Sequence, residues 1–209
     1  MRRKVLDAAA ELFQSRGYAV ATLQDIAERA GVTLGAMHHH FRSKKLIGLT
    51  VLRERVRPAL EAAWLSPVSS ASSTAEGIAT AFRAIEDALD ARQAVQGCPV
   101  NNLAIELSLA DADFRFEIQQ LFADWRGQIA SKLRSDLAEG KLKNVDADAF
   151  ATVVVAAYSG AMALAKAEQA TEALKICRRH LVAELASRGS DLGESRSLAQ
   201  DDAPRAGSR

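Results

Sequence analysis

Residues 22–45, TLQDIAERAGVTLGAMHHHFRSKK, decide the fold because they predict two short helices joined by a glycine turn. Thr22 and Asp25 have the spacing of a capping box, in which each side chain bonds the other residue's backbone N–H at a helix start. Gly31 comes where this helix should end, and glycine adopts the left-handed conformation of a helix C-terminus without a Cβ clash. The first half of the segment therefore predicts a short helix followed by a tight turn.

The second half of the segment predicts a helix with an apolar inner face and a polar outer face. Thr33 is a candidate N-cap, and Met37 and Phe41 fall on the inner face. A polar, ring-bearing face followed at once by a basic run is suited to a phosphate backbone. We therefore expect a helix-turn-helix that binds duplex DNA. The residues expected on the outer face are Thr33, Leu34, Gly35, His38 and His39.

The composition favours helices and separates a basic end from an acidic body. Of the 209 residues, 48% are hydrophobic and 5% aromatic, which suits helices packed closely through small side chains. Residues 1–60 hold 11 Lys and Arg against 5 Asp and Glu, whereas residues 61–209 hold 16 against 21. A basic end is expected to meet a polyanion. A few surplus lysines near a chain end give the same pattern, so charge alone does not decide the partner.

The chain carries no predicted membrane span or secretory signal. A span requires about 20 apolar residues, and polar residues interrupt the longest candidate, residues 147–167. The start, MRRKVLDAAAELF, has acidic side chains where a signal peptide has an uncharged apolar block. Cys98 and Cys177 have no disulfide or metal spacing. We expect a reduced, cytoplasmic protein that binds no membrane.

Apolar residues recur at helical spacing along the rest of the chain, and no segment shows strand alternation. A helix should start near Ser43, bend at Pro58 and end at Ser66-Pro67, so that residues 66–74 form a loop. The other helices are expected at about 3–16, 74–92, 99–109, 112–139, 146–166 and 171–187.

Residues 5–52 resemble the N-terminal segment of the tetracycline-repressor (TetR) family of bacterial transcription regulators. This segment reads VLDAAAELFQSRGYAVATLQDIAERAGVTLGAMHHHFRSKKLIGLTVL. The family's cues occur in order, first AAxLFxxxGY, then TxxxIAxxAGV, then GxxxHxFxSK. Further along, GCPVNNLAIELS at residues 97–108 is similar to a segment found in one branch of the family.

The resemblance implies an all-α protein with a three-helix DNA-binding head, residues 1–47, in which the helix-turn-helix spans about residues 22–41. It implies a ligand-binding and dimerisation body, residues 48–188, and the polar tail at 189–209 is expected to be disordered. Proteins of this family usually repress as homodimers on a palindromic operator. A small-molecule effector bound in the body releases them from the DNA.

The resemblance also assigns DNA contacts. The position of His38 is commonly tyrosine in the family, and that of Leu34 is often Lys or Arg. Leu34 cannot donate to a guanine edge, so its expected base contact is a thymine methyl group. The contacts carried onto this chain are Thr22, Thr33, Leu34, Gly35, His38, His39, His40 and Lys44.

The body should hold an apolar pocket with a few polar groups. Cys98 should cap the helix that Pro99 begins. Its thiol there is either a low-pKa sensor of oxidants and electrophiles or a small buried side chain. Lys166 either neutralises an acidic ligand or a thiolate, or stabilises a helix C-terminus. The pocket candidates are Phe82, Cys98, Asn102, Leu103, Glu106, Phe122, Trp125, Tyr158, Met162 and Lys166.

The last two helices carry small and apolar residues that suit a homodimeric four-helix seam or, alternatively, packing within one chain. The seam candidates are Ala156, Gly160, Ala161, Ala163, Ala167, Ile176, Leu181, Val182 and Leu185.

No set of side chains predicts catalysis, a metal centre or a cofactor. Consecutive histidines point about 100° apart on a helix, so the three at 38–40 cannot converge on one ion. The sequence has no glycine-rich phosphate loop and no nucleophile elbow. Asp111, Asp113 and Glu117 should form a solvated helix start.

We therefore predict a DNA-binding regulator and no enzyme. Two alternatives remain open at this point. In the first, the protein is a redox- or electrophile-sensing repressor that acts through Cys98. In the second, it is an enzyme or adaptor whose head has lost DNA binding. The intact basic run at residues 42–45 argues against the second alternative.

Overall fold

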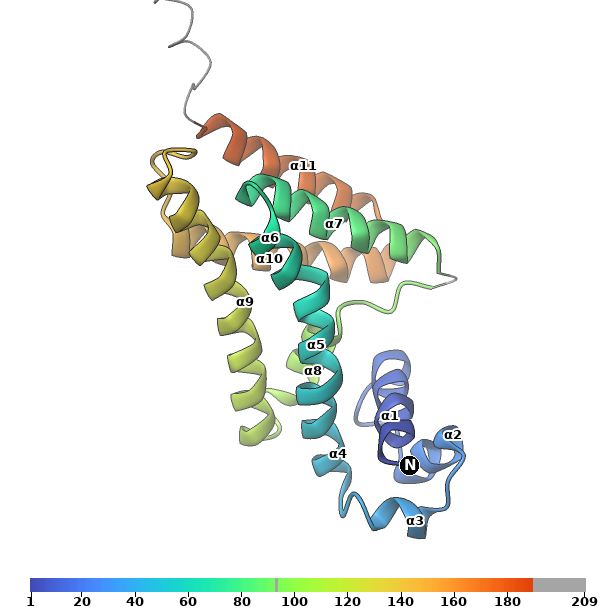
Figure 1. Ribbon diagram of the computed structural model, residues 1–209. Coiled ribbons are helices and arrows are strands. Elements are labelled where there is room, and N and C mark those ends of the chain that lie inside the picture. Colours follow the sequence, from blue (N-terminus) through green and yellow to red (C-terminus); the bar gives the residue numbers. More distant parts are fainter. Residues whose placement is uncertain (93, 190–209) are drawn as a thin grey trace, which may run out of the picture.

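The computed structural model of the protein describes residues 1–92 and 94–189 and shows a small helical head below a larger helical body (Figure 1). The head consists of α1 (Arg2–Arg16), α2 (Leu23–Ala30) and α3 (Leu34–His38). Within the described residues the chain forms helices and one isolated bridge, between Leu142 and Gly189. The predicted all-α fold is confirmed, and the predicted disorder of the tail falls on residues 190–209, outside the described residues.

The caps of α2 and α3 form as the sequence predicts. Thr22 Oγ1 accepts from the Asp25 N–H at 3.1 Å, and the Asp25 carboxylate accepts from the Thr22 N–H at 2.8 Å. Gly31 ends α2 in the left-handed region, with φ 65° and ψ 40°. Thr33 Oγ1 accepts from the Ala36 N–H at 3.2 Å and starts α3. Met37 is fully buried beneath α3, so the outer face of α3 is the one left free.

One continuous helical rod, residues 44–70, leads from the head into the body (Figure 1). It consists of α4 (Lys44–Val51), a π-helical turn η1 (Leu52–Val56), α5 (Arg57–Leu60), a second π-helical turn η2 (Glu61–Leu65) and α6 (Ser66–Ser70). The prediction that Ser66-Pro67 ends this helix and that 66–74 is a loop is wrong. Only residues 71–73 lie outside helices there.

The two π-helical turns explain how the rod continues past its prolines. Proline lacks an N–H, and its ring collides with the carbonyl group four residues earlier in an α-helix. Each π-helical turn ends two residues before a proline, Pro58 or Pro67, and so widens the helix just where the ring must fit. The carbonyl that Pro58 cannot bond belongs to Glu54, and the Arg55 guanidinium donates to it at 2.8 Å.

The body adds α7 (Thr74–Asp90), α8 (Pro99–Leu107), α9 (Ala112–Ala138), α10 (Ala147–Glu168) and α11 (Glu172–Ser187), close to the predicted ranges. In Figure 1, α9 runs beside the rod, and α7, α10 and α11 lie together at the opposite end from the head. The centre of the body is an aromatic cluster of Trp64, Phe82, Trp125 and Tyr158, whose neighbouring ring centroids lie 4.9 to 5.7 Å apart.

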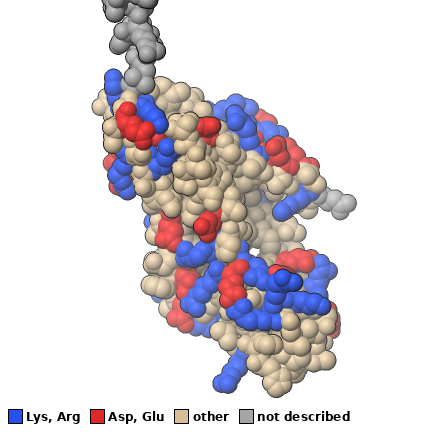
Figure 2. All heavy atoms as spheres, viewed as in Figure 1, with Lys and Arg blue, Asp and Glu red and all other residues tan. Residues whose placement is uncertain are grey.

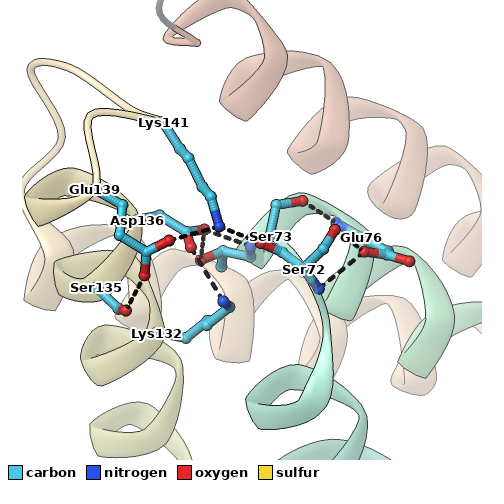
Figure 3. A network of polar contacts seen from close by, with 9 residues as sticks. Ser72, Ser73, Glu76, Lys132, Ser135, Asp136, Glu139 and Lys141 are labelled. Atoms are coloured by element: carbon cyan, nitrogen blue, oxygen red, sulfur yellow. Dashed lines mark hydrogen bonds and ion pairs between the residues drawn. The ribbon is translucent and has the colours of Figure 1, made fainter.

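A polar network fixes the turn between α6 and α7 onto the end of α9 (Figure 3). The fully buried Asp136 carboxylate accepts from the Thr74 N–H at 2.6 Å and from its hydroxyl at 2.7 Å. Lys132 Nζ lies 3.1 Å from the other oxygen of this carboxylate. Lys141 Nζ donates to the Ser72 carbonyl at 2.7 Å. The rod is thereby held at its far end, opposite the head.

α10 is long and apolar enough to cross a membrane by length and composition, with a mean hydropathy of 1.5. Its place in the fold gives another reason for this composition. One face, including Val154, Tyr158 and Ala165, is buried in the body, whereas Val153 and Leu164 on the opposite side are about half exposed. A core helix with an uncovered second face has the same composition as a membrane span.

Candidate nucleic-acid interface and ligand cavity

The outer face of the helix-turn-helix is open to solvent. Leu34 is 37% exposed, and Thr33, Gly35 and the three histidines at 38–40 are exposed as well. Arg42 follows them, exposed and without a side-chain partner among the described residues. Figure 2 shows Lys and Arg side chains, interspersed with Asp and Glu, over the upper part of the head and the start of the rod, whereas the lowest part of the head is mostly uncharged apart from one protruding basic side chain. The structure therefore brings the predicted contact residues to one accessible face with basic neighbours.

Two predicted contacts already have partners within the chain. The Thr22 hydroxyl donates to the Asp25 carboxylate at 2.6 Å, so its proton serves the cap of α2. Lys44 Nζ donates to the Ala19 carbonyl at 3.0 Å and lies 4.6 Å from the centre of the Tyr18 ring. Partial burial lowers the pKa of Lys44.

The acidic start of α9 is solvated at Asp113, as the sequence suggests, but its carboxylates also pair with basic side chains of the rod. Lys45 Nζ lies 2.7 Å from the Asp111 carboxylate and 2.8 Å from that of Asp113, and Glu117 pairs with Arg53. The two carboxylates raise the pKa of Lys45. Because α4 belongs to the rod and α9 to the body, these ion pairs connect the base of the recognition region to the body.

Glu106, predicted as a pocket residue, instead binds the loop between α1 and α2 (residues 17–21). Its carboxylate accepts from the Tyr18 N–H at 2.8 Å and also from the Ala19 N–H. It lines none of the cavities described below. The loop is thus held on one side by Glu106 of α8 and on the other by Lys44 of α4, which makes it a joint between head and body.

A second joint runs from α1 to α10 through the segment before α8. Gln14 Nε2 of α1 donates to the Gly97 carbonyl at 2.6 Å, and Asn102 Nδ2 donates to the Gln96 carbonyl at 2.9 Å. Lys166 Nζ donates to Asn102 Oδ1 at 3.4 Å. Asn102 and Lys166, both pocket candidates, therefore also take part in holding the head against the body.

One cavity of the body, the aromatic cavity, has a volume of about 290 Å³ and is bounded by the rod, α7, the start of α8, α9 and α10. Four of the pocket candidates line it, and Phe82 lies behind the rings of Trp64 and Tyr158 without reaching it. Its lining includes Leu60, Trp64, Ala88, Cys98, Trp125, Tyr158 and Met162.

The other candidates lie at neighbouring cavities. Cys98 and Met162 separate the aromatic cavity from a second cavity of about 400 Å³ that reaches Asn102, Phe122 and Lys166. Leu103 lines a third cavity of about 210 Å³ near α1. The predicted pocket is therefore divided into compartments around Cys98.

Cys98 caps α8 ahead of Pro99, as predicted, but its thiol is not activated there. The side chain is 5% exposed. Burial raises the pKa of Cys98, and this effect outweighs the opposing hydrogen bonds from the start of α8. Of the two alternatives for Cys98, the structure favours the small buried side chain, because desolvation of the thiolate exceeds the stabilisation by the helix dipole.

Comparison with known proteins identifies the chain. Residues 5–47 match the bacterial regulatory proteins of the tetR family, and residues 74–180 match the C-terminal domain of LmrA/YxaF-like transcriptional regulators. The chain belongs to the TetR family. It is a DNA-binding transcription regulator, as predicted.

Three TetR-family proteins illustrate the similarity. The HTH-type transcriptional repressor DhaR of Mycobacterium sp. (strain GP1) is 29% identical over 190 residues, which cover 83% of this chain and 86% of DhaR. The regulator LmrA of Bacillus subtilis (strain 168) is 26% identical over 168 residues, 78% of this chain and 85% of LmrA. The crystal structure of a TetR regulator from Chloroflexus aurantiacus J-10-FL matches with a TM-score of 0.81 at 25% identity, covering 90% of this chain and 95% of that one.

Some residues of the predicted dimer seam lie on a free face of this TetR-family chain, and others lie in its core. Ala161, Leu181 and Leu185 are buried inside the chain and cannot contact a partner. The free face of α10 instead carries exposed residues at helical spacing, which continue onto α11. These exposed residues are Val153, Ala156, Gly160, Ala163, Leu164, Ala167 and Ile176.

Among the described residues, no group of three or more His, Cys, Asp or Glu side chains could hold a metal ion. Sequence reasoning missed the side chains that connect the head to the body. It did not single out Gln14 or Lys45, and it assigned Glu106 to the pocket. Their partners lie 66 to 88 residues away along the chain, and no local pattern marks them.

Proposed function

We propose that the protein is a homodimeric repressor that binds a palindromic operator and is released from it by a small molecule in the aromatic cavity. The observation that carries the proposal is the free outer face of α3, which is exposed although Met37 beneath it is fully buried. A helix held from inside and open outside is suited to enter a major groove. The relatives named above include a transcriptional repressor, DhaR, which supports repression as the mode of action.

The side chains of the head divide into base and phosphate contacts. Thr33, Leu34, Gly35 and His39 would face the base edges, where Leu34 suits a thymine methyl group. His38, His40 and Lys44 would contact phosphates. Lys44 Nζ has three N–H donors, so it can donate to a phosphate while it also bonds the Ala19 carbonyl, which would couple DNA binding to the α1–α2 loop.

Dimerisation supplies the second head. The free face of α10, with Val153 and Leu164 each about half exposed, supports a four-helix seam formed by α10 and α11 of two chains. Two recognition helices must lie about 34–36 Å apart to enter successive major grooves. A ligand that shifts the rod therefore weakens operator binding when it changes this separation by several ångströms. A cytoplasmic location follows from this function.

The proposal is tested by isolating genomic fragments that the purified protein retains, and by measuring their affinity with His39→Ala. Loss of one base contact should weaken binding by about 1–3 kcal/mol. Gln128→Ala, which removes an exposed polar side chain of α9 outside both the head and the proposed seam, is the control and should leave affinity unchanged. Affinity should fall steeply with rising salt. Absence of duplex binding at low salt overturns the proposal and favours an adaptor.

The redox alternative has less support. A buried thiol with a raised pKa reacts slowly with oxidants, because the thiolate is the reactive form. Cys98→Ser should therefore leave the response to peroxide unchanged in a DNA-release assay. A peroxide response that disappears in this variant would restore the alternative.

A further inference from the structure

We propose that residues 95–99, which we call the strap, transmit ligand binding in the aromatic cavity to the head through the Gln14 side chain of α1. This route is separate from the rod. The inference rests on the proposed function, in which the cavity holds the effector, and it assigns the regulation of that site to a named contact.

The strap is part of the wall of three cavities. Gly97, Cys98 and Pro99 line the aromatic cavity, Gly97 and Cys98 also line the second cavity, and Pro99 lines the third. The Cys98 side chain, only 5% exposed, lies between the first two cavities. A ligand that fills the aromatic cavity therefore contacts the strap, and any widening of the cavity on this side moves it.

The strap is held to the body by a side chain and not by a regular helix. Residues 95–98 belong to no helix. Gln169, which follows the last residue of α10, accepts from the Val95 N–H at 3.0 Å and donates to the Val95 carbonyl at 3.2 Å. A segment outside regular structure opens at a lower free energy than a core helix does. The strap is therefore suited to move while α8 and α10 stay folded.

On its other side, the strap is bonded to the head. Gln14 Nε2 donates to the Gly97 carbonyl at 2.6 Å and to the Gln96 carbonyl at 3.3 Å. Asn102 Nδ2 donates to the Gln96 carbonyl at 2.9 Å and to Gln14 Oε1 at 3.3 Å. A shift of the strap by about 1 Å away from α1 takes even the shortest of these contacts beyond hydrogen-bond range. The contact therefore responds to small displacements.

α1 has room to follow the strap. The third cavity lies between Phe13 and Gln14 of α1, the rod and Pro99, so this part of α1 is not packed tightly against the body. Elsewhere α1 contacts α2, and its Leu6 and Ala9 side chains are fully buried. A displacement at Gln14 is therefore a displacement of a helix that belongs to the head.

The proposed function sets the sign of the coupling. If a ligand that moves the strap releases the head from DNA, the form of the protein that binds DNA has the strap in place. Coupling between two sites is reciprocal, so operator binding at the head must in turn hold the strap closed. This reverse effect can be measured before the effector is identified.

The test measures how fast N-ethylmaleimide labels Cys98. The chain has two cysteines, so the variant Cys177→Ser leaves Cys98 as its one thiol. Because Cys98 is buried, labelling requires the strap to open. Saturation with the retained genomic fragment should slow labelling about fivefold, at the lower end of common allosteric couplings.

Two variants of this single-thiol protein separate the head side of the strap from its body side. Gln14→Ala should speed labelling of the free protein and abolish the slowing by DNA. Gln14→Met, which keeps the length of the side chain but has no N–H donor, is the second variant and should behave alike. Gln169→Gly is the matched control, since it removes the anchor to α10 at a position whose φ of 53° suits glycine. It should speed labelling but keep the slowing by DNA.

The outcomes separate this inference from the proposed function. The inference is overturned if operator binding leaves the labelling rate unchanged, if the slowing survives in the Gln14 variants, or if Gln169→Gly abolishes it as well. Loss of operator binding by both Gln14 variants also overturns it, because the contact would then hold the head in place and carry no signal. A single-thiol protein that binds no duplex refutes the proposed function instead.

Discussion

Replacement of Glu106 by glutamine should loosen the joint between the head and the body. The Glu106 carboxylate accepts two backbone N–H groups, from Tyr18 and from Ala19. Glutamine keeps one acceptor oxygen and turns an NH₂ group towards the other N–H. A hydrogen bond to a charged group contributes about 1.5–3 kcal/mol when buried, and partial exposure reduces this. We therefore expect the free energy of unfolding to fall by about 1–2 kcal/mol.

Two measurements check this expectation. Thermal unfolding followed by circular dichroism should show a melting temperature lower by about 2–8 °C, given about 2–4 °C per kcal/mol for a chain of this size. Amide hydrogen exchange at Tyr18 and Ala19 should accelerate while the core of the body stays protected. The control is Glu139→Gln, whose carboxylate pairs with Lys141 on the surface and should change stability by less than about 0.5 kcal/mol. Unchanged exchange at both amides would refute the reasoning.

Three other predictions concern packing, a buried charge and pH. A Cβ on Gly48 would lie 2.6 Å from the Phe114 ring, so Gly48→Ala should lower the free energy of unfolding by about 1–3 kcal/mol. A Cβ on Gly127 would have nothing within 4 Å, so Gly127→Ala should not lower it. Equal urea midpoints for the two variants would contradict this prediction. Asp136→Asn removes the fully buried charge that faces Lys132 and should cost about 2–4 kcal/mol in urea unfolding; a loss below about 0.5 kcal/mol would show that the charge is dispensable. Hydrogen bonds from Thr22 lower the pKa of Asp25 in the folded protein. The stability that such a carboxylate contributes is present above its pKa in the unfolded chain and is lost as pH falls through its pKa in the folded protein, so melting temperatures should decline below about pH 4. A melting temperature that stays constant below about pH 4 would contradict this prediction.

The sequence predicted the helix-turn-helix well because its signals are local. The cap of α2 uses Thr22 and Asp25, three residues apart, and Gly31 ends the same helix. These interactions form within the helix and its flanks, so their residue types and spacing are visible in the sequence. The exposed face of α3 followed from the same pattern.

The errors arose where distant segments or unusual helix geometry decide the structure. Ser66-Pro67 predicts a helix end only for an α-helix, and the π-helical turn before it removes the conflict. Glu106 was predicted to be a polar residue of the pocket, but its carboxylate accepts hydrogen bonds from backbone N–H groups 87 and 88 residues away. Leu181 suited a dimer seam by composition, and only the packing of α11 shows that it faces the core.

The two π-helical turns also set the rotational phase between the head and the cavity. A residue added to or removed from an α-helix turns everything beyond it by about 100°, and each π-helical turn contains such an extra residue. Deleting one residue from Leu52–Val56 should therefore turn the recognition helix away from its present orientation relative to the body while the head stays folded. In the proposed dimer on DNA, the number of residues in this rod therefore sets the direction in which the recognition helix faces.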